Sequence, residues 1–322
     1  ILALVVFVLL IFGLVMITSI GVPKSIQLSA PGVDYPNCGD GNVDCYLLFK
    51  NHLMRMGIAL IAFFIIFKIP YNFWNKAAIV IFGMTVFGLI LVLIVGKSFN
   101  TTAQSWFQIF ETSIQPSEFA KLALIFYFSA WVSKKGNTIQ SFNDGFLPFC
   151  VISGMVILPV ILQPDLGSTL VMAVTAVAMY FVSGARLRHL VLGLTVALLI
   201  SLVIIPNVTH VRERFQAFMA TGEGCEEDYC WQSQQASIAV GSGGFWGKGL
   251  TQGVQKSYWL PQASDDFIFA ASAEELGFLR ISLIVILFSI IGYRGYYIAN
   301  HAPTRFAMIT AAGITTWVVS QA

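Results

Sequence analysis

Long apolar runs occupy most of this 322-residue chain and constrain its fold more than any other feature. The hydrocarbon core of a bilayer is about 30 Å thick, so a helix that spans it needs roughly 20 apolar residues. Nine runs approach this length, and the shorter ones must be extended by their flanks. The pattern therefore predicts nine transmembrane helices. The runs are residues 1–20, 53–68, 77–95, 119–132, 146–162, 168–183, 190–206, 267–291 and 307–319.

The composition excludes the soluble classes of protein. Hydrophobic residues make up 57% of the chain and charged residues only 11%, whereas soluble domains average about 45–50% and 25%. A soluble enzyme, a nucleic-acid-binding protein and a disordered chain are excluded, so no nucleic-acid partner is expected. We expect residues 1–322 to form a single all-α, polytopic membrane domain.

The basic residues predict the orientation of the chain. If the nine segments alternate in direction, the loops on one side hold eight Lys or Arg residues and one acid, a net charge of +7. The other side holds ten bases and 15 acids, a net charge of −5. Lys and Arg resist translocation, so we expect the basic side and the N-terminus to be cytoplasmic. Residues 207–266, between the seventh and eighth segments, then form a large extracytoplasmic loop, and loops of that length usually carry function.

The ends of the chain suggest a longer protein. Ile1 lies inside an apolar run, and Ala322 follows the ninth run closely. Nine spans would leave the C-terminus outside the cell, so we expect a tenth helix beyond residue 322.

Four cysteines fall in the predicted outer loops. Cys38 and Cys45 lie in the first of them, and Cys225 and Cys230 lie in the largest. An oxidising compartment permits disulfides, and four thiols allow three pairings. We favour one local bridge per loop because each pair lies in one short segment; four free thiols are the alternative.

Polar residues gather where two of the apolar runs begin. Ser117 and Glu118 precede the fourth run, with Lys121 one turn later, and Asp165 precedes the sixth. An ionisable group at a membrane is costly, which favours a functional role. The alternative is helix-start chemistry, in which Glu118 complements the positive helix end and Asp165 caps its helix.

The eighth run has more acids than capping requires. Asp265 and Asp266 precede it, and Glu274 and Glu275 follow. If all lie on one helix, Asp266 and Glu274 share a face about 12 Å apart along the axis. The glycine-rich segment 241–249 lacks the spacing of a P-loop, so a flexible or re-entrant loop near the membrane is the better interpretation.

These segments, taken in order, resemble the SEDS (shape, elongation, division and sporulation) family of FtsW- and RodA-type proteins. The ordered set is specific, although each short motif alone is weak. Residues 255–261 are more similar to the FtsW branch than to RodA. The matching segments are 115–121 (QPSEFAK), 164–167 (PDLG), 238–244 (IAVGSGG), 260–261 (LP), 266–270 (DFIFA) and 274–277 (EELG).

The resemblance implies a fold of ten helices in the bacterial cytoplasmic (inner) membrane. It implies a peptidoglycan glycosyltransferase that polymerises lipid II at the outer leaflet during cell division or elongation. It also implies a divalent cation (Mg or Mn). The implied partners are a class B penicillin-binding protein, which is a transpeptidase, and other divisome or elongasome membrane proteins.

We assign Asp266 as the general base, in a partly desolvated setting among other acids, since a carboxylate suits deprotonation of a sugar hydroxyl. Asp266 is also a possible metal ligand. The pyrophosphate leaving group needs cationic help, from Lys121, Lys248 or Lys256 or from the metal. The other substrate-binding candidates are Trp106, Ser117, Glu118, Asp165, Glu274 and Glu275.

Two other classes of function stay open. A lipid II flippase or transporter would carry polar groups through to the cytoplasmic side, whereas here they cluster at the outer ends. A non-enzymatic divisome scaffold would not need Asp266. Three segments depart from the family pattern: Ser105 before Trp106, residues 262–265 (QASD, including Ser264 and Asp265) before Asp266, and Arg280.

Overall fold

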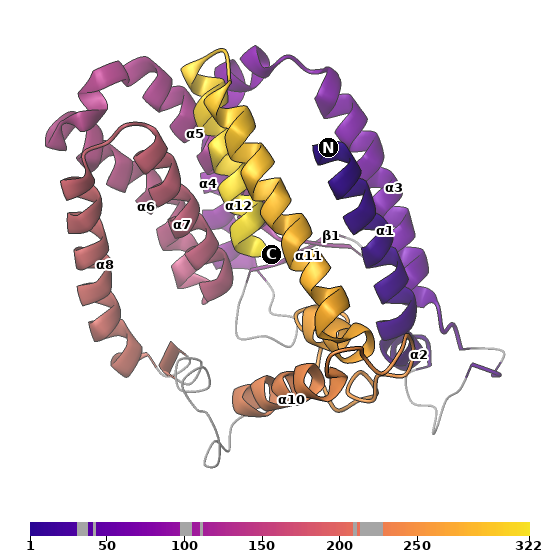
Figure 1. Ribbon diagram of the computed structural model, residues 1–322. Helices are drawn as coiled ribbons and strands as arrows, with labels where there is room; N and C mark the ends of the chain where they lie inside the picture. The colour runs from indigo at the N-terminus through magenta and orange to yellow at the C-terminus, as the bar shows by residue number, and fades with distance from the viewer. Residues whose placement is uncertain (31–37, 41–42, 97–104, 110–111, 209–210, 213–227) are drawn as a thin grey trace. The chain divides into compact units, whose positions relative to one another are not determined.

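The structure is a computed structural model that describes residues 1–322 except 31–37, 41–42, 97–104, 110–111, 209–210 and 213–227. It consists mainly of helices (Figure 1). The α-helices are α1 (Leu2–Ile20), α2 (Val22–Ser29), α3 (Leu47–Lys68), α4 (Tyr71–Val95), α5 (Pro116–Lys135), α6 (Leu147–Leu162), α7 (Leu166–Val182), α8 (Leu187–Asn207), α10 (Asp228–Gly243), α11 (Ile268–Asn300) and α12 (Arg305–Gln321). A 3₁₀ helix, η1 (Gly136–Gln140), and a π-helix, η2 (Phe142–Phe146), connect α5 to α6.

Each of the nine apolar runs lies mostly in helical structure. Five described helices are long and apolar enough to cross a bilayer: α1, α3, α4, α11 and the stretch Phe142–Leu162. Helices α7 and α8 are apolar but shorter over their hydrophobic stretches, and α12 has only 17 residues. The chain therefore has the helices of a multi-pass membrane protein.

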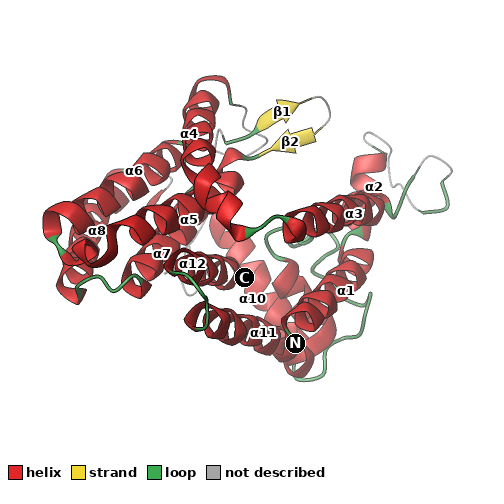
Figure 2. Ribbon diagram, turned by 90° about the horizontal axis from the view of Figure 1, so that it is seen from above, coloured by secondary structure: helices red, strands yellow, loops and turns green. Residues whose placement is uncertain are grey.

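The all-α expectation is wrong in one detail, a two-stranded hairpin (Figure 2). Strand β1 (Phe107–Ile109) pairs antiparallel with β2 (Thr112–Ile114), with Phe107 opposite Ile114. The hairpin lies between apolar runs, and its aromatic and β-branched residues favour extended backbone. It leads directly into the start of α5.

The chain divides into two compact units. The first unit contains Ile1–Phe67 and Leu198–Leu287, and the second contains Lys68–Ala197 and Phe288–Ala322. In the second unit, α5 packs against α4, α7 and α12 (Figure 1). Its core includes Phe128, Phe149 and Tyr180, and the last two rings stack with centroids 4.3 Å apart.

The first unit has a smaller core around the end of α1. Met16 and Ile20 are buried together with Ala239 of α10, Leu260 and Ala270. The α1 helix therefore packs on the loop before α11. A disulfide joins Cys38 to Cys45 in the loop after α2, which confirms the local pairing in the first loop. Cys225 lies outside the described residues, and so does the side chain of Cys230.

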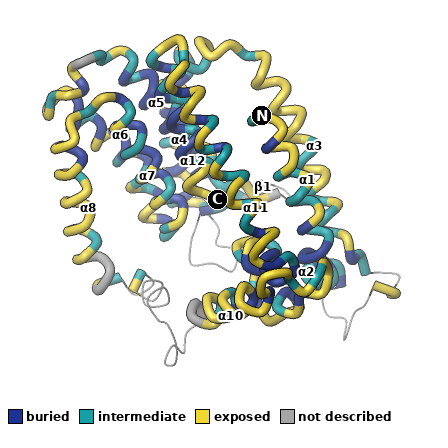
Figure 3. The backbone as a smooth tube through the Cα atoms, viewed as in Figure 1, coloured by how far each residue is buried: buried dark blue, intermediate teal, exposed yellow. Residues whose placement is uncertain are grey.

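Several helices are exposed along most of their length. No residue of α3 is buried, and most of the described side chains of α8 are exposed (Figure 3). Both helices are rich in large hydrophobic side chains, and a helix that is apolar on all faces without being covered by protein is typical of a membrane span.

The α11 helix is broken, and the expected continuous helix over 267–291 is wrong in this respect. Gly277 has φ 77° and ψ 172°, a conformation that glycine alone adopts without steric penalty. The helical segment that begins at Ile268 therefore stops at the glycine and a second one continues after it.

Candidate functional site

Two adjacent acids before the break in α11, Glu274 and Glu275, are completely buried. The Lys248 Nζ lies 2.7 Å from an oxygen of Glu274. The backbone N–H groups of Val254 and Gln255 also donate to this carboxylate, at 3.1 and 3.0 Å. Its buried charge is therefore paired and hydrogen-bonded, as a buried charge must be.

Glu275 makes a second ion pair. The Lys256 Nζ lies 2.6 Å from its carboxylate, and the Ser19 hydroxyl at the end of α1 donates to it at 2.6 Å. Lys256 also donates to the Ser19 carbonyl oxygen at 3.1 Å, and the Thr251 N–H donates to the Ser19 hydroxyl at 3.1 Å. The two glutamates thus fasten the loop 248–256 to α11, and Glu275 also joins it to α1.

The glycine-rich segment supplies hydrogen-bond partners for backbone groups at the break in α11. The N–H groups of Lys248 and Gly249 donate to the carbonyl oxygens of Glu274 and Glu275, at 3.0 and 2.9 Å. The Phe278 N–H donates to the Gly244 carbonyl oxygen at 2.9 Å. Irregular backbone near a membrane is tolerated where protein supplies such partners.

Asp266 lies outside this buried network. It belongs to a run of turns that ends before α11 begins at Ile268, so Asp266 and Glu274 do not share a helical face. Its side chain is exposed, and the expected partial desolvation is wrong. The neighbouring Asp265 forms an ion pair with Lys24 of α2. No hydrogen bond or ion pair of the Asp266 carboxylate occurs within the described ranges.

A second polar cluster lies in the second unit, around the start of α5. Lys121 is buried, and its Nζ lies 2.7 Å from Glu118 and 3.0 Å from the side-chain oxygen of Gln321. The amine also lies 6.0 Å from the ring centroid of Trp317. Gln321 and Trp317 were not among the predicted candidates; the available signal was their four-residue spacing at the end of an apolar run.

Asp165 joins two motifs that are 48–50 residues apart in the chain. One of its oxygens caps α7 by accepting the Ser168 N–H at 3.0 Å. The other accepts from the Gln115 amide at 2.9 Å and from the Ser117 hydroxyl at 3.4 Å. Asp165 therefore caps α7, as the alternative interpretation expected, and also links the start of α7 to the start of α5.

The remaining candidates are less closely connected. Trp106 is partly buried just before β1, and Ser105 beside it is buried. The described contacts do not link Trp106 to Lys121 or Asp165. Arg280, which departs from the family pattern, donates to the Trp246 carbonyl oxygen at 3.2 Å.

The site residues do not form a complete protein ligand set for a metal. Within the part of the chain that the structure describes, no three His, Cys, Asp or Glu side chains are grouped to hold an ion. Asp265, the carboxylate next to Asp266, is paired with Lys24. The described residues therefore supply no ligand set made of protein side chains alone for the divalent cation that the resemblance implies.

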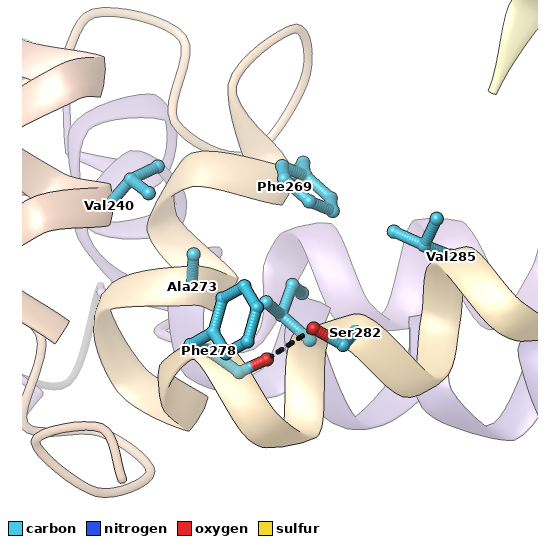
Figure 4. A pocket seen from close by; sticks show the side chains of 7 residues that line it. Val240, Phe269, Ala273, Phe278, Ser282 and Val285 are labelled. Carbon is cyan, nitrogen blue, oxygen red and sulfur yellow. Dashed lines mark hydrogen bonds between the residues drawn. The ribbon is translucent and has the colours of Figure 1, made fainter. Parts of the chain in front are cut away.

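An apolar pocket of about 270 Å³ lies beside the break in α11 (Figure 4). The Ser282 hydroxyl, one of its few polar groups, donates to the Phe278 carbonyl oxygen at 2.7 Å. The pocket therefore offers apolar contact and few free polar groups. Its lining comprises Val240, Phe269, Ala273, Phe278, Ile281, Ser282 and Val285.

Known proteins share this fold. A chain from a peptidoglycan synthase complex, studied for the coordination of polymerization and crosslinking, superposes with a TM-score of 0.69 at 23% identity, covering 96% of this chain and 82% of that one. The rod shape determining protein RodA of Thermus thermophilus superposes with a TM-score of 0.64 at 20% identity, covering 98% and 80%.

Curated relatives match by sequence as well. Stage V sporulation protein E of Bacillus subtilis (strain 168) is 35% identical over 321 residues, which is 97% of this chain and 84% of the relative. The probable peptidoglycan glycosyltransferase FtsW of Legionella pneumophila is 33% identical over 323 residues, covering 98% and 78%. The whole chain, residues 1–322, matches the family FTSW_RODA_SPOVE, described as cell cycle protein. The chain is a member of this FtsW, RodA and SpoVE family.

Proposed function

We propose that this protein is a peptidoglycan glycosyltransferase that polymerises lipid II, with Asp266 as its general base. Relatives named probable peptidoglycan glycosyltransferase FtsW match it at about one third identity over most of its length. The observation that carries the assignment of the base is the accessible carboxylate of Asp266, which is exposed and unpaired among the described residues. Such a carboxylate is free to accept a proton from a bound hydroxyl.

In the proposed reaction, the 4-hydroxyl of one sugar attacks the anomeric carbon of another lipid-linked sugar. Asp266 takes the hydroxyl proton as the new C–O bond forms. The bond from the anomeric carbon to the pyrophosphate oxygen breaks with its electron pair, which leaves a lipid pyrophosphate anion. General-base catalysis of this kind contributes about 10²–10⁴-fold in rate.

Lys248 is the lysine best placed to meet that anion. The side chains of Lys121 and Lys256 are only 3% and 8% exposed and are held in ion pairs, whereas that of Lys248 is 35% exposed. Lys248 can therefore contact solvent or substrate while it still pairs with Glu274. We assign Lys121, Lys256 and the two glutamates mainly to holding the architecture of their sites.

The apolar pocket beside Gly277 suits the polyprenyl tail of the substrate. One of its lining residues, Ala273, directly precedes Glu274 in the chain. No step of the reaction is assigned to a divalent cation.

We also propose a topology and partners for the chain in the inner membrane. The nine helical runs cross the bilayer with the N-terminus in the cytoplasm, a tenth helix follows, and residues 207–266 lie outside. Its partners are a class B penicillin-binding protein, which crosslinks the glycan that this protein makes, and other divisome or elongasome membrane proteins.

Reconstitution of the full-length protein with its transpeptidase and labelled lipid II tests the function. Wild type should make glycan strands, and Asp266→Asn should lower the rate at least 100-fold. Asp144→Asn, an exposed acid in the other unit, is the matched control and should retain full activity. Full activity of Asp266→Asn would refute the role of Asp266 as the base. If wild type made no polymer, the glycosyltransferase assignment would be wrong and the protein would be a transporter or a scaffold. A lipid II flipping assay without the partner distinguishes these two classes.

A further inference from the structure

The corner between α1 and α2 contacts the chain on both sides of Asp266. Ser19 of α1 accepts from Lys256, which precedes Asp266, and donates at 2.6 Å to Glu275, which follows it. Lys24 of α2 forms its ion pair with Asp265, directly before Asp266. The exposed Asp266 therefore lies between the attachments at Asp265 and Glu275 in the chain.

The backbone of this segment is held, while the Asp266 side chain is not. The N–H groups of Asp265 and Phe267 both donate to the Gln262 carbonyl oxygen, at 3.0 and 3.4 Å. Leu260 and Ala263 are buried in the cluster that contains the end of α1. The direction in which Asp266 points therefore depends on how firmly its neighbours are fixed.

Asp265 is the neighbour that Lys24 fixes. Without this ion pair, the turn that carries Asp266 would lose its attachment to α2. His52 and Arg55 of α3 line a small cavity of about 100 Å³ together with Asp265. Lys24 is the residue that makes the direct ion pair.

We propose that Lys24 is a positioning residue for the reaction of Asp266. By holding Asp265, it fixes the turn from which the Asp266 carboxylate reaches the substrate. This inference rests on the proposed function, and it assigns a catalytic purpose to α2, a helix of eight residues outside the sequence motifs.

Steady-state kinetics of the full-length protein with its transpeptidase test the proposal. Lys24→Met should lower kcat about fivefold with KM for lipid II unchanged, since a partly exposed ion pair contributes up to a factor of about five. Lys24→Arg should restore kcat. Asp265→Ala should reproduce the loss, and the double variant Lys24→Met with Asp265→Ala should lose no more than either single variant, because the two residues act through one contact.

Lys50→Met is the matched control, because Lys50 forms an exposed ion pair with Asp44 in the same unit. It should leave kcat unchanged. A rise in KM for Lys24→Met at constant kcat, or additive losses in the double variant, would overturn the proposal.

Hydrogen exchange separates this proposal from the proposed function, because it needs no activity. Amides of residues 262–267 should exchange faster in Lys24→Met than in wild type or Lys24→Arg, with the rest of the chain unchanged. Equal exchange in all three proteins would refute the positioning role even if wild type polymerises lipid II. Faster exchange in Lys24→Met supports the contact even if wild type proves inactive and the reaction must be reassigned.

Discussion

Gly277 and Gly247 lie with their backbones in direct contact. A Cβ atom added to Gly277 would come within 2.2 Å of the Gly247 nitrogen, and one added to Gly247 would come within 2.3 Å of the Glu275 carbonyl oxygen. Both glycines also have positive φ, 77° and 82°. The glycine-rich loop and the broken helix therefore fit together only without side chains at these positions.

Gly277→Ala should destabilise the protein by about 3 kcal/mol or more, since backbone strain and overpacking each cost about 1–3 kcal/mol. Thermal unfolding of the purified protein measures this. Gly57→Ala is the control, because no atom lies within 4 Å of the added methyl group and the residue is in the middle of α3. It should be neutral or slightly stabilising, and equal losses in the two variants would contradict the close-contact explanation.

Glu275→Gln should be strongly destabilising. It leaves the buried Lys256 amine without its counter-ion, and breaking a buried pair from one side costs about 3–5 kcal/mol. Replacing both residues together, Glu275→Leu with Lys256→Met, should recover much of that loss, since the uncompensated charge is then absent. Denaturation midpoints decide the question, and a double variant that is less stable than Glu275→Gln would show that the network does more than neutralise charge.

Asp165→Ala should destabilise the protein by more than the loss of a helix cap does. Loss of a cap costs about 1 kcal/mol, and Asp165 also holds Gln115 and Ser117. Thr304→Ala removes the comparable cap of α12, where the Thr304 hydroxyl accepts the Ala307 N–H at 3.2 Å. We expect Asp165→Ala to lower both stability and polymerisation, and Thr304→Ala to lower stability alone. If the two variants behaved alike in both the stability and the polymerisation assays, Asp165 would have no role beyond capping α7.

Filling the apolar pocket should weaken binding of the lipid tail. Ser282→Leu places an added apolar side chain in the pocket, so KM for lipid II should rise severalfold with kcat little changed. A substrate with a short tail should be affected less than the full-length lipid. Leu283→Trp, at an exposed neighbouring position outside the pocket lining, is the control. An identical response to both tail lengths would place the tail elsewhere.

The helices were predictable because membrane thickness fixes how many apolar residues a span requires. That constraint is local, so all nine runs lie mostly in helices. The break at Gly277 was not predictable from the apolar pattern, since a glycine inside a helical run is compatible with a continuous helix. The predicted shared face of Asp266 and Glu274 was wrong for a related reason. Their helical spacing has meaning only if both residues lie in the helix, and the helix starts at Ile268, after Asp266.

Most residues of the two polar clusters were among the predicted candidates, but their pairings were not predictable. Glu118 and Lys121 are one turn apart, so their ion pair follows from local geometry. Ser19 lies 256 residues from Glu275 and shows no unusual local pattern. Lys248 pairs with Glu274 and Lys256 with Glu275 because of the path that the intervening loop takes. Glycines determine that path through their backbone conformations, which the motif alone does not specify.

The junction at Asp165 has a consequence for inheritance. Its hydrogen bonds to Gln115 and Ser117 couple two stretches that are distant in the sequence. Substitutions in one stretch should be accompanied by compensating changes in the other. A chimera between relatives should therefore take residues 115–121 and 163–168 from the same parent, because a hybrid with mixed parents can lose these hydrogen bonds.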